Sequence, residues 1–346
     1  MAMLVKRLCA QLVDGSGAGR ILLSLRARHG SPWLTVLTYH RVIEGAPGEH
    51  RFDEGVVDAT PAAFAEQVEF LARHFSVVTI DDLCRRAAGG SLPRNPLLIT
   101  FDDGYRDNFE HVLPILSRVG VSAAFFIATS FTTERRVYWW DRISYAVKRS
   151  TKKRITLSLP APLTIDLESP AARRRAVPII TRIIKSHFAL DLPAYLADIE
   201  RACDVEWSPS LERTLADELV MTWDEVRALA AAGMDIESHT RTHRLLNMLP
   251  LDEVADELRG SSDDLLCEIG RRPRAVSYPV GHSIAGRPGL RAAVRAAGYE
   301  LGFSNRPGIN YTSARFDPFN MRRLPIDLEI EKAHFRGVLA IPNLGF

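Results

Sequence analysis

The chain lacks the features that mark several protein classes. Its 346 residues include only four cysteines, and none of these are in the C-x-x-C spacing of a zinc ribbon or a redox motif. A disulfide framework is therefore not predicted, and we expect reduced, buried thiols. No apolar run approaches the roughly 18 residues that a membrane-spanning helix needs. The four cysteines are Cys9, Cys84, Cys203 and Cys267.

A strong charge of either sign is also missing. The formal net charge of +2 is small beside 44 basic and 42 acidic residues, which argues against a nucleic-acid partner bound through bulk charge. Hydrophobic residues at 46% and charged residues at 25% are ordinary for a globular protein, so neither a disordered nor a fibrous class is predicted. The length fits about two domains or one large α/β barrel with additions.

The N-terminal stretch is basic and partly apolar, but it does not form a signal peptide. Lys6, Arg7 and Asp14 interrupt its apolar residues before a signal-peptide core can form. We predict an N-terminal amphipathic helical segment over residues 1–30 and a cytoplasmic protein. Peripheral contact of this segment with a membrane surface is the alternative.

A buried strand that ends in two acids organises the rest of the chain. The run Leu97-Leu98-Ile99-Thr100-Phe101 has strand length and is followed by Asp102-Asp103-Gly104. Asp and Gly are common in turns, so these residues alone fit a simple turn as well as a catalytic site. In α/β proteins, however, side chains at the carboxyl ends of strands often carry the chemistry.

A second stretch far downstream adds two histidines. Residues 233–243 are predicted to form a short strand that runs into a polar segment containing His239 and His243. If this segment turns helically, the i, i+4 spacing places both imidazoles on one face, where they can share a metal ion. Two histidines and one carboxylate, with coordination positions left open, form a site typical of zinc or another divalent ion that activates water.

With these two motifs the sequence resembles the NodB-like polysaccharide deacetylases of carbohydrate esterase family four. Their T-F-D-D-G strand end and H-[ST]-x-x-H segment match residues 100–104 and 239–243. The resemblance implies that Asp103, His239 and His243 bind one divalent metal ion, while Asp102 stays free as general base. Imidazole and carboxylate ligands suit Zn²⁺ best, with Ni²⁺, Co²⁺ and Mn²⁺ as alternatives. No other cofactor is predicted.

A strand predicted over residues 33–42 contains a third histidine of interest, His40. A histidine at the end of a core strand is often structural. The Tyr39-His40 pair, however, is similar to the permuted subtype of the family, the poly-N-acetylglucosamine deacetylases, in which a Tyr-His strand near the N-terminus supplies the catalytic histidine. This resemblance implies that His40 is the general acid for the leaving amine, and we expect it to titrate near neutrality.

The family's R-P-P-Y-G motif is only partly present. Residues 274–281 keep Pro279 and Gly281 but have Ser277 for the arginine and Val280 for the tyrosine. A backbone donor does not depend on its side chain, so Val280 N–H can still complete the oxyanion hole. In the family this arginine orients the base aspartate, and Arg323, which ends the last strand signal of the chain, is the candidate replacement.

Strands and helices alternate along most of the chain, which predicts parallel βαβ units. The fold class is therefore α/β, a distorted (β/α) barrel of the polysaccharide deacetylase type over residues 31–346. The alternation lapses at about 131–220, where we predict an inserted subdomain of helices and a hairpin. Basic runs at 148–154 and 173–175 in this insert are either solvated faces or sites for acidic partners.

The function predicted from these residues is metal-dependent hydrolysis of an N-acetyl group. The substrate would be an N-acetylated amino sugar in a bacterial polysaccharide or a lipid-linked glycan precursor. Two alternatives remain at this point, a catalytically silent glycan-binding barrel and a deacylase of a small non-carbohydrate amide.

Overall fold

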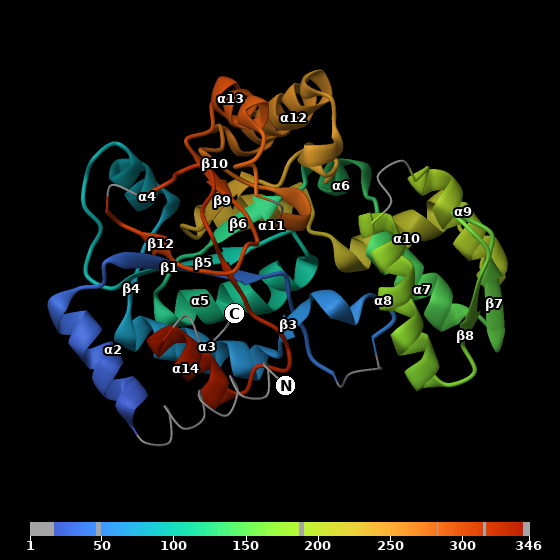
Figure 1. Cartoon of the computed structure of the whole chain (residues 1–346), viewed down its shortest axis with the longest axis horizontal. Helices are drawn as coiled ribbons and strands as arrows, with labels where there is room; N and C mark the ends of the chain where they lie inside the picture. The colour runs from blue at the N-terminus through green and yellow to red at the C-terminus, as the bar shows by residue number, and fades with distance from the viewer. Residues whose placement is uncertain (1–16, 46–49, 187–189, 282, 314–315, 342–346) are drawn as a thin grey trace. The chain divides into compact units, whose positions relative to one another are not determined.

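A computed structural model describes residues 17–45, 50–186, 190–281, 283–313 and 316–341 (Figure 1). The chain divides into two compact units. The sheet unit comprises Met1–Ile43, Asp58–Thr133 and Met221–Phe346, and the helical unit comprises Glu44–Val57 and Glu134–Val220. Residues 1–16 of the predicted N-terminal segment lie outside the described residues, and Ala18–His29 forms helix α2.

The sheet unit is built on a nine-stranded sheet in the order β11-β10-β9-β6-β5-β1-β12, with β13 also paired to β1 and β4 to β5. All pairings in it are parallel except that of β12 with β1. Its strands are β1 (Trp33–Tyr39), β4 (Ser76–Val77), β5 (Pro96–Phe101), β6 (Ala124–Ile127), β9 (Asp235–Ser238), β10 (Ala275–Ser277), β11 (Leu301–Phe303), β12 (Asn310–Tyr311) and β13 (Leu324–Pro325).

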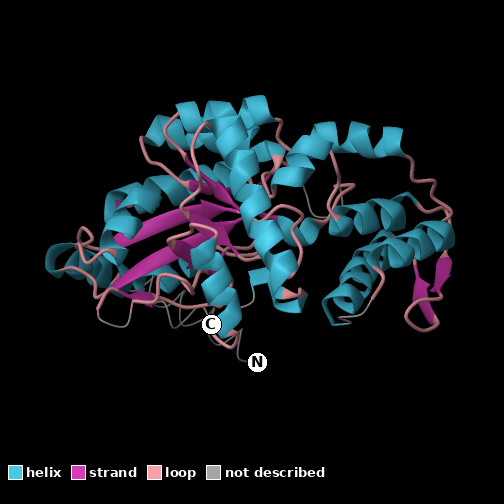
Figure 2. Cartoon of the chain, turned by 90° about the horizontal axis from the view of Figure 1, so that it is seen from above, coloured by secondary structure: helices cyan, strands magenta, loops and turns pink. Residues whose placement is uncertain are grey.

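Helices cover this sheet (Figure 2). They are α2, α3 (Pro61–His74), α4 (Ile80–Ala87), α5 (Leu113–Val119), α6 (Thr129–Glu134), α11 (Trp223–Ala231), α12 (Leu251–Ile269), α13 (Pro288–Ala296) and α14 (Lys332–Ala340). Shorter elements are β2 (Arg41–Val42), β3 (Val57–Ala59), the π-helix η2 (Asn108–Val112) and the 3₁₀ turns η1 (Glu54–Val56), η3 (Leu246–Met248) and η4 (Pro279–Gly281).

Strand β5 lies inside this sheet with every residue buried. A parallel strand covered on both faces needs a continuous apolar run, which explains why residues 97–101 show such a run in the sequence. Its side chains alternate between two apolar clusters: Leu97, Ile99 and Phe101 pack under the helices, and Leu98 packs on the opposite face with residues of β1, β6, β10 and β11. The two-residue period of the strand therefore directs Asp102 toward the second face.

The sheet curls into the predicted distorted barrel, so the α/β fold class is confirmed. A bridge from Phe303 to Met321 and the pairing of β13 with β1 link the two ends of the parallel strands. This path carries the segment that contains Arg323 between β11 and β1.

The helical unit consists of helices and a hairpin, and it includes Glu44–Val57. Its own apolar core includes Ile143, Ile155, Ile180 and Tyr195. Its elements are α7 (Trp139–Arg149), the hairpin strands β7 (Arg154–Leu157) and β8 (Leu163–Asp166), α8 (Pro170–Ser186), α9 (Leu192–Cys203) and α10 (Pro209–Leu219).

The basic runs of this unit have structural contacts. The Lys148 ammonium donates to the carbonyls of His50 and Phe52 and to Glu54. The Arg173 guanidinium donates to the carbonyls of Val147 and Ser150. These two cations therefore hold the unit's own backbone.

Several local expectations need correction. The amphipathic pattern of residues 107–119 predicts one helix, but this segment opens with the π-helix η2 before α5 begins. The run of residues 76–80, rich in β-branched side chains, predicts a strand, but the strand stops at Val77. Thr79 and Asp82 instead form a capping box that starts α4. Cys84 and Cys203 are buried as expected, but Cys267 is exposed on α12. Among the described residues, no helix is both long and apolar enough to cross a bilayer.

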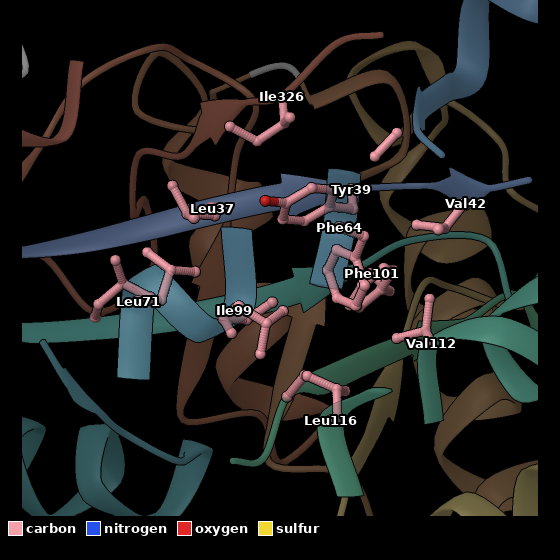
Figure 3. Close-up of a cluster of buried hydrophobic side chains, with 14 of the residues drawn as sticks. Leu37, Tyr39, Val42, Phe64, Leu71, Ile99, Phe101, Val112, Leu116 and Ile326 are labelled. Carbon is pink, nitrogen blue, oxygen red and sulfur yellow. The ribbon is translucent and has the colours of Figure 1, made fainter. Parts of the chain in front are cut away.

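Phe101 provides a test of the core. Its ring stacks on Tyr39 and Phe125 at centroid distances of 5.3 and 5.0 Å and meets Phe64 edge to face (Figure 3). Replacing Phe101 with Ala should lower the free energy of unfolding by about 3–5 kcal/mol, because it leaves a cavity under the helices. Chemical denaturation measures this loss, and Tyr311→Ala, at an exposed position, is the control that should change little. Equal losses in both variants would contradict the packing described.

Candidate active site

A sharp turn at the end of β5 sends its two acids in different directions. Asp102 N–H still donates to Tyr39 O at 2.9 Å, so the ladder with β1 continues to this residue. Asp103 and Gly104 then adopt φ values of 74° and 84°, a left-handed conformation that Asp tolerates and Gly favours. Both carboxylates are buried, with 1% and 2% of their surfaces exposed. The turn gives adjacent residues separate partners.

Asp102 forms a buried, bidentate ion pair with Arg323. The distances are 2.8 Å from Nη1 to Oδ1 and 2.6 Å from Nη2 to Oδ2, and the arginine side chain has no exposed surface. Ser277 Oγ donates to Asp102 Oδ2 at 3.1 Å and accepts from Arg323 Nη2 at 2.9 Å. Burial would raise the pKa of Asp102, but the guanidinium holds that pKa below its usual value. The carboxylate therefore stays ionised.

Asp103 faces the two imidazoles. Its Oδ1 lies 3.3 Å from Nε2 of His239 and 3.3 Å from Nε2 of His243, and the three ligand atoms lie within 4.8 Å of one another. Burial alone would raise the pKa of Asp103, but the adjacent imidazoles of His239 and His243 lower it. Burial lowers the pKa of His243. An ionised carboxylate and a neutral imidazole are the forms that bind a metal ion.

Contacts behind the histidines orient this cluster. Nδ1 of His239 lies 2.8 Å from the carbonyl oxygen of Ser277 and must carry the proton of that bond, which leaves Nε2 as the ligand atom. Two nitrogens and one oxygen converging in a buried site fit a divalent ion such as zinc. The residues present therefore fit the metal that the sequence analysis expects.

The segment between the two histidines is not the helical turn that we considered. Thr240 and His243 have φ values of 64° and 56°, which no right-handed helix allows. The buried Glu257 of α12 accepts the backbone N–H groups of Arg241 and Thr242 at 3.0 and 2.8 Å. This carboxylate folds the loop so that the histidines meet without a helix.

His40 follows β1 and pairs with a carboxylate that the sequence analysis did not identify. Its Nδ1 lies 3.1 Å from Oδ2 of Asp58, which also accepts the His40 backbone N–H. Burial lowers the pKa of His40, but the Asp58 carboxylate outweighs it and raises the pKa to about 9. The expectation that His40 titrates near neutrality is therefore wrong. An acid inside the otherwise apolar stretch Val56-Val57-Asp58-Ala59 was the available signal.

The backbone that bears His40 is held from the η2 side. Asn108 Nδ2 donates to His40 O at 2.9 Å, and Asp107 accepts the Val42 N–H and the Arg41 guanidinium, both at 2.9 Å. The residues that follow the Asp102-Asp103-Gly104 turn thus position the neighbouring strand end. π-Helical turns such as η2 occur frequently at functional sites.

Of the remaining predicted site residues, the structure brings Arg323 to Asp102 as described. Val280 lies in η4, three residues beyond Ser277, with φ of 59°. Its role as a backbone donor stays a prediction.

Comparison with known proteins identifies the family to which the chain is similar. A model described as polysaccharide deacetylase matches residues 89–157 and 179–302, more than half of the chain. No curated protein matched.

Solved structures share the fold. Streptococcus pyogenes deacetylase PplD in complex with acetate is 16% identical, with a TM-score of 0.56 over 86% of this chain and 94% of that one. IcaB from Ammonifex degensii is 18% identical, with a TM-score of 0.54 over 90% and 97%. A de-N-acetylase from Aggregatibacter actinomycetemcomitans is 17% identical, with a TM-score of 0.53 over 90% and 99%. At these identities the likeness shows the fold.

The donor cluster predicts metal content directly. The purified chain should bind about one divalent ion, and replacing His239 or His243 with Ala should abolish most of that binding, because one of only three protein ligands is lost. Elemental analysis after dialysis and calorimetric titration with Zn²⁺ measure this. His111→Ala, on η2, is the control that should keep the ion. Full occupancy in both histidine variants would refute the assignment.

Proposed function

Because the chain belongs to the polysaccharide deacetylase family, and is an enzyme that acts on N-acetyl amide bonds, we propose that it deacetylates an N-acetylated amino sugar. The substrate would be a bacterial polysaccharide or a lipid-linked glycan precursor, and one divalent metal ion would serve the reaction. One observation carries the proposal: the adjacent Asp102 and Asp103 are buried against different partners, a guanidinium and a pair of imidazoles.

This division of partners separates two roles. When bound by Asp103, His239 and His243, a divalent ion supplies Lewis-acid polarisation and lowers the pKa of coordinated water. Asp102 has both oxygens on Arg323, which keeps the carboxylate ionised and fixes its orientation. In this proposal Asp102 accepts the proton of the attacking water, and the Val280 N–H donates to the oxygen of the tetrahedral intermediate.

His40 would complete the reaction from the other side. Its Nδ1 is occupied by Asp58, so Nε2–H is the group free to face a substrate. With a pKa of about 9 the imidazole carries its proton at neutral pH. When the C–N bond breaks, that proton passes to the amine nitrogen, and acetate and a free amino sugar leave.

The test of the substrate class is acetate release. The metal-loaded protein would be incubated with N-acetylglucosamine oligomers, with lipid-linked N-acetyl sugars and with small non-carbohydrate acetamides. Release from a glycan substrate alone supports the proposal. Release only from the small amides favours a small-amide deacylase, and no release from any of them, with metal bound, favours a glycan-binding barrel.

The two acids should respond differently to the same change. Asp102→Asn should lower kcat by about 10²–10⁴-fold with the metal retained, because the base is lost while the ligands are intact. Asp103→Asn should lose metal affinity as well. Metal content and kcat, expressed per folded molecule, decide this. The reverse pattern would show that the two roles are exchanged.

His40→Ala should lower kcat by about 10²–10⁴-fold without loss of metal. In the wild type, deprotonation of His40 should produce a fall in rate at about pH 9. Asp58→Asn removes the negative charge that raises this pKa, so the fall should move to lower pH, toward the ordinary value of 6.5.

The pH dependence of kcat and the thermal stability of each variant separate this role from a structural one. A structural histidine predicts lost stability with near-normal kcat and no shift in the profile. Near-normal kcat would leave His334 as the next candidate; His282, also near the C-terminus, lies outside the described residues.

A further inference from the structure

Helix α2 turns large apolar side chains toward solvent. Ile21, Leu22 and Leu25 have 62%, 37% and 47% of their surfaces exposed. Their i, i+1, i+4 spacing places them on one face of the helix. A contiguous apolar stripe on a short surface helix indicates a surface that is covered in use, unlike single exposed residues.

The other face of α2 is firmly held, so the stripe is not the result of a loose helix. Leu23 is 1% exposed within the main apolar cluster. The Arg26 guanidinium lies 4.6 Å from the centre of the Trp33 ring and donates to the Leu339 carbonyl at 2.5 Å. These contacts fix which side of α2 faces outward.

The stripe continues into a basic patch. Arg28 and His29 are exposed and follow Leu25 at i+3 and i+4 on the same face. Exposed Arg94 joins them, since its guanidinium donates to the Arg28 carbonyl at 2.9 Å. The sequence from Ala18 to His29 contains no Asp or Glu. Positive charge therefore lies beside the apolar side chains with no acid in the helix to neutralise it.

Helices α14 and α3 both pack against α2. Helix α14 contains no Asp or Glu, and the acids of α3 are already paired. On α3, Glu66 lies 2.6 Å from Lys332, and Glu69 pairs with Arg73 and with Arg118. The surface around the stripe thus favours an anionic partner.

We propose that α2 docks this protein on an anionic lipid bilayer. Ile21, Leu22 and Leu25 would enter the boundary between headgroups and acyl chains, and Arg28, His29 and Arg94 would contact lipid phosphates. Charge complementarity favours this occupant over a neutral apolar protein surface. The inference stands apart from the deacetylase proposal, because it uses none of its residues.

The topology keeps docking separate from hydrolysis. Helix α2 leads into the N-terminal end of β1, whereas His40 follows the C-terminal end of β1 and Asp102 follows that of the parallel β5. The docking helix and the candidate active site therefore belong to opposite ends of the same strands. Variants of α2 should leave acetate release from a soluble oligomer unchanged.

Vesicle flotation of the full chain tests the proposal. The protein should float with vesicles of phosphatidylglycerol and phosphatidylcholine in equal amounts, and far less with phosphatidylcholine alone. Raising the salt from about 0.1 M to about 1 M should weaken binding, because screening shortens the range of the charge attraction. Ile21→Glu and Leu25→Glu should each reduce partitioning at least about tenfold. The double variant Arg28→Gln, Arg94→Gln should lose the preference for anionic vesicles.

Ile179→Glu is the matched control, because Ile179 on α8 is also 47% exposed but lies in the helical unit. It should float like the wild type. No flotation of the wild type, or an equal loss in Ile179→Glu, overturns the proposal. A second overturning result is a wild-type dimer, detected by light scattering, that does not bind vesicles and that Leu25→Glu dissociates. The stripe would then be the contact surface for a second copy of the chain. Thermal melting of each variant checks that the fold is retained.

Discussion

The buried ion pair between Asp102 and Arg323 is the interaction on which the candidate site depends. Neither side chain reaches water, so each charge is stable only while the other is in place. The pair also joins segments that are distant in the chain, the end of β5 and the start of β13, with Ser277 of β10 hydrogen-bonded to both. Removal of either charge would strand the other one in the core. The same contact thus links these segments and keeps the Asp102 carboxylate ionised.

Two kinds of histidine result from how each imidazole is buried. His243 faces Asp103 deep in the barrel, where burial lowers its pKa and favours the neutral form that a metal ion requires. His40 is partly exposed, with 23% of its side chain accessible, and the Asp58 carboxylate raises its pKa to about 9. At neutral pH the ends of the parallel strands therefore carry a neutral imidazole, His243, and a protonated one, His40. Such a separation of pKa values is how neighbouring groups take different parts in one reaction.

Local sequence signals predicted those helices and strands whose formation depends mainly on nearby residues. The sequence pattern predicts helices over Pro61–His74, behind a Thr60 cap, and over Leu251–Ile269, and these match α3 and α12. Apolar periodicity and caps are set by nearby residues. The apolar run of β5 predicted a strand buried on both faces. The helix α10 was missed although its start carries local signals, the Ser208 cap and Pro209 in the first turn. The π-turn η2 was missed because its local pattern does not differ from that of a regular helix.

What the sequence alone determined is the inventory of chemistry: two acids after a buried strand, two histidines at a fixed spacing, and a third histidine after another strand. Only the tertiary structure decided the partners. The left-handed turn at Asp103 and Gly104 separates the two acids, and Arg323 pairs with Asp102 across the barrel. The Asp58 carboxylate raises the pKa of His40. Glu257 accepts backbone N–H groups of the loop between the two histidines and fixes its fold. The three contacts join residues that are distant in the sequence, and the turn adopts a backbone conformation that depends on the packing around it. Residue periodicity and spacing cannot predict such contacts, because the burial of these side chains and the distances between them are set only when the sheet has curled.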